Sequence, residues 1–143
     1  RKPVSKSIER KLKAKYVSES VLYKKSDVIS LHVPYNKDTH HLMNSKIFKK
    51  MKKTSFLINT SRGKIVNEKQ LVTALKTKEI QGAGMDVYES EPVHRDSLLL
   101  KLENVVLAPH VGSSTNETRR KMSDITVKNL VFALEGKKLL YSV

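Results

Sequence analysis

Hydrophobic and polar positions along the chain follow two different patterns. Nearly continuous apolar or β-branched runs, typical of strands buried in a sheet, occur at 27–33, 55–60, 82–87 and 104–109. Helices are predicted at 5–12, 20–25, 44–53, 67–78 and 114–136, and the last three show apolar residues three or four positions apart. Strand and helix thus alternate along the chain, which predicts an α/β fold with a mostly parallel sheet and flanking helices.

Several finer features follow from the same pattern. Asn67 with Gln70, and Ser114 with Glu117, have the spacing of a capping box, and Gly136 is expected to end the last helix. A further short strand is expected at 15–17, and a loop or short helix at 98–102. In the last helix the residues expected to face inward are Met122, Ile125, Leu130, Val131 and Leu134.

The charge of the 143-residue chain is strongly basic, with 28 Lys and Arg residues against 14 Asp and Glu and a net charge of +14. Such a balance makes nucleic acid a partner to consider. However, the lysines are dispersed along the predicted helices, aromatic residues make up only 6%, and neither an RNP motif nor a zinc-finger pattern occurs. We therefore expect no nucleic-acid partner, and interpret the charge as a solvated basic surface that attracts phosphate-bearing cofactors.

Other classes of site are disfavoured by what the sequence lacks. No apolar run approaches the roughly 20 residues that a membrane span needs, and the first residues lack the apolar segment of a secretory signal. The chain has no cysteine, and its histidines and acids do not follow metal-ligand spacing. We expect no membrane partner, no metal site and a cytoplasmic location.

Chemically reactive residues follow the predicted strands. Arg62 comes after the second strand, Asp86 ends the third with Glu89 and Glu91 just beyond, and His110 follows the fourth. Because the carboxyl ends of parallel strands meet at one edge, these groups are expected to converge there. A cation, an acid and an imidazole suit the reduction of a carbonyl next to a carboxylate.

Each group has a role in that reaction. Arg62 can hold the substrate carboxylate through two hydrogen bonds and polarise the carbonyl. His110 can give a proton to the carbonyl oxygen, and a carboxylate such as Glu91 on its other ring nitrogen fixes the tautomer. None of these residues supplies hydride, so a nicotinamide cofactor must.

Other interpretations of these residues stay open. An arginine at a strand end is often only a surface or ion-pairing group, and Asp86 could be a turn acid. Ser61 has no base positioned by the sequence, which disfavours a hydrolase. His32 is interpreted as strand packing or a backbone hydrogen-bond donor, and three other histidines as surface residues: His40, His41 and His94.

The sequence resembles the D-isomer-specific 2-hydroxyacid dehydrogenases over residues 16–136. The segments that match are 26–34, 58–63, 82–92 and 107–115, and the residues at 119–123 and 129–136 are most similar to the glyoxylate/hydroxypyruvate reductase branch. The resemblance implies NAD or NADP as cofactor, a small 2-oxoacid such as glyoxylate or hydroxypyruvate as substrate, and a homodimer. A scaffold or corepressor that binds a dinucleotide without physiological turnover is the alternative.

The resemblance also implies roles for individual residues. Catalysis falls on Arg62, Glu91 and His110. Cofactor binding falls on Val33, Pro34, Thr60, Ser61, Arg62, Asp86, His110 and Gly112, with Asp86 on the nicotinamide carboxamide.

One departure from the family concerns the glycine-rich phosphate loop. The 5 glycines are not in G-x-G-x-x-G spacing. We therefore interpret residues 1–143 as a truncated, Rossmann-type NAD(P)-binding domain, inactive by itself, whose helix at 115–136 leads back to a substrate domain. Arg1 and Lys2 would then lie where the adenosine ribose is bound, which favours NADP.

Overall fold

The computed structural model describes residues 5–142 and divides into two units. The first unit extends to Ala108 and contains all the strands described, and the second begins at Pro109. Arg1 and Lys2 lie outside the described residues.

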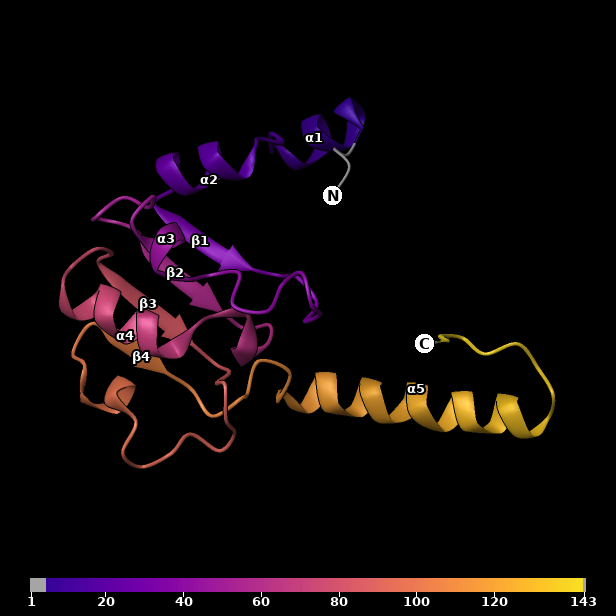
Figure 1. Cartoon of the computed structure of the whole chain (residues 1–143). Helices are drawn as coiled ribbons and strands as arrows, with labels where there is room; N and C mark the ends of the chain where they lie inside the picture. The colour runs from indigo at the N-terminus through magenta and orange to yellow at the C-terminus, as the bar shows by residue number, and fades with distance from the viewer. Residues whose placement is uncertain (1–4, 143) are drawn as a thin grey trace. The chain divides into compact units, whose positions relative to one another are not determined.

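A parallel sheet with neighbours in chain order forms the centre of the first unit (Figure 1). Its strands are β1 (Val28–Leu31), β2 (Phe56–Asn59), β3 (Gly82–Met85) and β4 (Val105–Leu107). The pairs β1–β2, β2–β3 and β3–β4 are all parallel. The predicted α/β class and all four long strand runs are confirmed.

Helices precede, connect and follow the strands. They are α1 (Lys6–Leu12), α2 (Glu19–Lys25), α3 (Ser45–Phe48), α4 (Glu68–Lys76) and α5 (Asn116–Leu134), with 3₁₀ turns η1 (Gly63–Ile65) and η2 (Leu98–Lys101). The core packs between sheet and helices, and its fully buried side chains include Phe48, Met43, Leu57, Leu71 and Leu75. This burial fixes the strand ends, where the candidate site lies.

Four local predictions are wrong. The helix predicted at 44–53 ends at Phe48 as α3, because the Lys50 and Met51 amides donate to carbonyls three residues back and form turns. The short strand expected at 15–17 does not form, because these residues pair with none of the described strands. Thr115, not Ser114, caps α5, because its hydroxyl accepts from the Thr118 amide. Asn67 caps α4 as predicted, but Gln70 does not complete the box: its side chain accepts from the Ser45 amide at 2.7 Å.

The apolar residues of α5 do not face inward in the described chain. None of the residues of this helix is buried, and Leu134 is 80% exposed. The reason is that the second unit contains α5 as its only described helix, so it provides no second layer against which α5 could pack. None of the helices described within residues 5–142 is long and apolar enough to cross a membrane.

Candidate functional site

An open hollow of about 730 Å³ lies where β1 and β2 end. It is lined by residues after β1, which are His32, Val33, Pro34 and Tyr35, and by residues after β2, which are Thr60, Ser61 and Arg62. Five predicted site residues, Val33, Pro34, Thr60, Ser61 and Arg62, are therefore brought together here. The volume falls in the range of ligand sites, and the lining combines apolar and polar surface. The strand-packing interpretation of His32 is wrong, because His32 follows the end of β1 and is exposed, with its Nε2 2.8 Å from Ser30 Oγ.

The turn that follows β2 is shaped by the buried side chain of Asn59. Its Oδ1 accepts from the Ser61 amide at 3.1 Å, and its Nδ2 donates to the Arg62 carbonyl at 3.0 Å. An asparagine that bonds the backbone two and three residues on fixes a tight turn. Ser61 Oγ then donates to the Val33 carbonyl at 2.6 Å and joins the ends of β1 and β2.

Arg62 emerges exposed from this turn. Its Nη1 donates to the Ser61 carbonyl at 2.7 Å, which folds the guanidinium back over the end of β2. The Asn59 side chain fixes the backbone of Arg62, and Arg62 lines the hollow. Such a group can bind a carboxylate through two parallel hydrogen bonds.

The end of β3 places two predicted acids. Asp86 is buried, and its amide donates to the Asn59 carbonyl at 3.0 Å, so it lies beside the Asn59 turn. Glu91 lies further along, and its Oε1 accepts from the Tyr88 amide at 3.0 Å. A backbone donor therefore orients the Glu91 carboxylate.

Tyr88 anchors this acidic segment. Its hydroxyl donates to the Ala108 carbonyl at 2.9 Å, at the end of β4. Burial, and then the charge of Asp86, raise the pKa of Tyr88. The phenol is therefore neutral at ordinary pH, as donation to a carbonyl requires.

His110 and Gly112 lie in the second unit. His110 has a φ of 56°, in the left-handed region that non-glycine residues rarely adopt. The predicted pairing of His110 with Glu91 stays a prediction, as do the catalytic and cofactor roles of all the site residues.

One histidine interpreted as a surface residue has a different environment. His41 is about two-thirds buried, and its Nε2 lies 2.9 Å from Glu89 Oε1. His41 is therefore only partly exposed, and its partners come from distant parts of the sequence. The only nearby sequence feature that could have indicated this environment of His41 is the turn-forming segment before it, 35–39.

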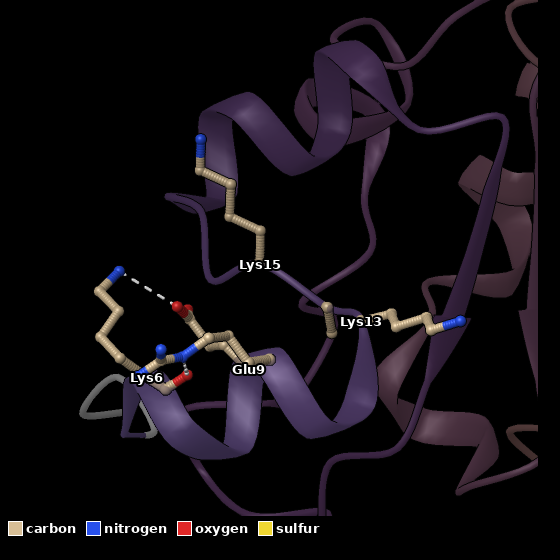
Figure 2. Close-up of a pocket in the computed structure, with 6 residues that line it drawn as sticks. Lys6, Glu9, Lys13 and Lys15 are labelled. Carbon is tan, nitrogen blue, oxygen red and sulfur yellow. Dashed lines mark hydrogen bonds and ion pairs between the residues drawn. The ribbon is translucent and has the colours of Figure 1, made fainter.

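A second hollow, of about 550 Å³, lies beside α1 and has a mainly basic lining (Figure 2). Glu9 lies within it, where Lys6 Nζ approaches its Oε2 at 3.1 Å and the Tyr16 amide donates to its Oε1 at 2.7 Å. The Tyr16 amide, and then Lys6, hold the pKa of Glu9 below its usual range. None of the predicted site residues lines this hollow. Within residues 5–142, no group of three or more histidines and acids could hold a metal ion.

The sequence of this chain matches a known protein family. The family described as "D-isomer specific 2-hydroxyacid dehydrogenase, NAD binding domain" matches residues 1–112. The chain belongs to this dehydrogenase family. The parallel sheet is accordingly the Rossmann-type sheet of its NAD-binding domain, as the sequence predicted.

Individual relatives agree with the family. A glyoxylate reductase from Korarchaeum cryptofilum is 46% identical over 129 residues, which are 90% of this chain and 39% of the relative. The structure of a glyoxylate reductase from Paecilomyes thermophila matches with a TM-score of 0.90 and 37% identity, over 99% of this chain and 42% of the other. The structure of an acyclic imino acid reductase (Bsp5) with NADPH and D-Arg matches with a TM-score of 0.82 and 35% identity, over 91% of this chain and 41% of the other. The chain thus spans about two fifths of the length of these relatives.

Proposed function

We propose that the complete polypeptide containing this chain reduces a small 2-oxoacid, glyoxylate or hydroxypyruvate, to the 2-hydroxyacid. The observation that supports this most directly is the presentation of Arg62 by the Asn59 turn at the edge of the hollow. A 2-oxoacid has a carboxylate for the guanidinium to bind, beside the carbonyl that is reduced. The relatives named glyoxylate reductase support the same substrate class.

The chain's own residues bind the substrate and move the proton. Arg62 binds the carboxylate and polarises the adjacent carbonyl. His110 gives its proton to the carbonyl oxygen, and Glu91, oriented by the Tyr88 amide, fixes the tautomer of His110. Reduced nicotinamide, when bound, supplies the hydride.

The hollow at the ends of β1 and β2 suits the nicotinamide part of the cofactor. Val33 and Pro34 provide apolar surface for a ring, and Thr60 and Ser61 provide polar groups in the same lining. Asp86, buried at the end of β3, can accept from the carboxamide. NADPH is the preferred cofactor in this proposal, because Arg1 and Lys2 would lie near the 2′-phosphate, and the related imino acid reductase was solved with NADPH.

Steady-state kinetics test the proposal. The complete polypeptide is mixed with NADPH or NADH and with glyoxylate, hydroxypyruvate or pyruvate, and the loss of reduced nicotinamide is followed. We expect turnover with glyoxylate or hydroxypyruvate, and faster turnover with NADPH than with NADH. Cofactor binding without turnover on every 2-oxoacid would instead support the dinucleotide-binding scaffold, and a strong preference for NADH would overturn the cofactor assignment.

A further inference from the structure

His41 lies where three segments of the first unit meet. Its backbone amide donates to the Lys64 carbonyl at 2.9 Å. Its ring Nδ1 lies 3.2 Å from Asn67 Nδ2, and its ring Nε2 lies 2.9 Å from Glu89 Oε1. One residue therefore contacts η1, the start of α4 and the acidic segment after β3.

The direction of these hydrogen bonds follows from the cap of α4. Asn67 Oδ1 accepts from the Gln70 amide at 3.0 Å, which leaves Asn67 Nδ2 facing His41 as a donor. Nδ1 of His41 must then be the acceptor, so the ring proton is on Nε2, where it is donated to Glu89. Both ring nitrogens are satisfied in one tautomer only, and this gives the ring a defined orientation.

Glu89 is itself held on both sides. Its Oε1 also accepts from the Glu68 amide at the first turn of α4, at 2.9 Å, and its own amide donates to Glu68 Oε2 at 3.1 Å. The positive end of the α4 dipole favours a carboxylate there. Glu89 lies between Tyr88 and Glu91 in the chain. Holding Glu89 in place therefore also holds the segment 89–91, which carries Glu91.

The backbone of His41 contacts the chain just after Arg62. Lys64, whose carbonyl accepts from His41, lies two residues after Arg62. The Met43 amide extends the same contact by donating to the Ile65 carbonyl at 3.0 Å. The backbone of His41 therefore fixes η1, which begins directly after Arg62.

The ring of His41 also contacts residues that lead to the hollow. His40 stacks on it, with ring centroids 3.9 Å apart and an angle of 23° between the planes. Tyr35, which lines the hollow, lies with its hydroxyl 3.2 Å from His40 Nδ1. The contacts of His41 thus extend to the loop beside the proposed cofactor.

We propose that His41 is a positioning residue: its backbone is fixed beside the Arg62 turn through Lys64, and its ring holds Glu89, and with it the segment that carries Glu91, in register with that turn. It does not touch the substrate. The expected effect of His41 on catalysis rests on the proposed reductase function. Its expected effect on structure rests only on contacts within the first unit.

Kinetics of the complete polypeptide give the first test. His41→Ala is expected to lower kcat/KM for glyoxylate by about 10- to 100-fold, since small displacements of catalytic groups have effects of this size. The loss should appear mainly in kcat, because the ring holds the segment of Glu91, which orients the proton donor. KM should change less, because the backbone bond to Lys64, two residues after Arg62, is kept. His41→Gln keeps an amide donor that can reach Glu89, and is expected to recover most of the loss.

Two further variants make this test specific. His94→Ala removes an exposed histidine outside these contacts and is expected to keep wild-type kcat and KM. If His41→Ala does not fold, His41→Asn replaces it, because asparagine also tolerates the φ of 50° but is too short to reach both partners. A folded alanine or asparagine variant with wild-type kcat and KM would overturn the proposal.

Amide hydrogen exchange on the 143-residue chain gives a test that is independent of activity. The Ile65 amide donates to the Arg62 carbonyl, and the Tyr88 amide donates to Glu91 Oε1, so each amide reports on one segment. His41→Ala removes the ring but keeps the backbone bond to Lys64, so it should speed exchange at the Tyr88 amide and leave the Ile65 amide nearly unchanged. His41→Gln should restore protection at Tyr88. Unchanged exchange at the Tyr88 amide in folded His41→Ala would overturn the positioning role. Absent turnover in the wild type together with faster exchange in His41→Ala would instead overturn the reductase function alone.

Discussion

Gly63 packs directly against the backbone of Tyr88, so closely that a side chain on Gly63 would overlap the Tyr88 carbonyl group. This contact joins the turn after β2 to the segment after β3. Arg62 precedes Gly63 in the chain, and the Tyr88 amide binds Glu91. The residues proposed to bind the substrate, Arg62, and to orient the proton donor, Glu91, thus lie on two segments that are connected through one backbone contact.

Replacing Gly63 by alanine should destabilise the chain by about 2 to 3 kcal/mol, because backbone atoms cannot move aside as a flexible side chain can. Urea denaturation measures the change. Gly136→Ala is the control: Gly136 has a φ of 65° with open space around it, so the substitution carries only the left-handed backbone cost of about 1 kcal/mol. Equal losses in the two variants would contradict a steric role for Gly63.

Asn59→Ala should lower the free energy of unfolding by about 1 to 3 kcal/mol, since it removes the bonds to the Ser61 amide and the Arg62 carbonyl from a buried position. Asn36→Ala is the matched control, because Asn36 also shapes a turn by accepting from the Asp38 amide, but is exposed. Water can replace that bond, so a change within about 0.5 kcal/mol is expected. Chemical denaturation of both variants would decide, and a larger loss in Asn36→Ala would contradict the prediction.

Patterns that are local in sequence predicted most of this unit. The strand runs correctly indicated β1 to β4, and Asn67 was correctly expected to cap α4, because apolar runs and caps depend on residues a few positions apart. The grouping of Thr60 to Arg62 near Val33 followed from the rule that parallel strands end at one edge.

What the sequence did not predict depends on contacts between distant residues. His41 meets Glu89 from 48 positions away, and Gln70 binds Ser45, which is 25 positions away, instead of completing its own cap. The helical pattern of α5 was correct, yet its inward face was not, since periodicity indicates an apolar side without indicating what covers it.

Alkaline pH should destabilise the chain through Tyr23. Burial, and then the charge of Glu19, raise the pKa of Tyr23 above its ordinary value of about 10. The folded state therefore keeps its proton where the unfolded state loses it, so this contribution is present below about pH 10 and is lost as pH rises through the folded pKa. Tyr23→Phe should show a shallower fall in unfolding free energy between about pH 9 and 11 by urea denaturation. An unchanged slope would contradict the prediction.

The exposed apolar side chains of α5 should make the chain self-associate. Leu130 is 60% exposed and Leu134 is 80% exposed on this helix. Sedimentation velocity of the 143-residue chain should show association that increases with concentration, and the double substitution of Leu130 and Leu134 by glutamate should weaken it. Lys128→Gln, an exposed change on the same helix, is the control and should leave association unaltered. A wild-type chain that stays monomeric at every concentration would contradict the prediction.

Arg62 and His110 should differ in the kinetic constants that their loss affects. Arg62→Gln in the complete polypeptide removes the bidentate bond to the substrate carboxylate, which exists before and during the reaction, so KM should rise while kcat falls. His110→Gln keeps a polar side chain but cannot give up a proton, so kcat should fall by about 100-fold or more with little change in KM. Steady-state kinetics with glyoxylate and hydroxypyruvate separate the two patterns, and Arg95→Gln, an exposed arginine outside the hollow, should match the wild type. Full activity of Arg62→Gln or His110→Gln on these substrates would refute the assigned roles.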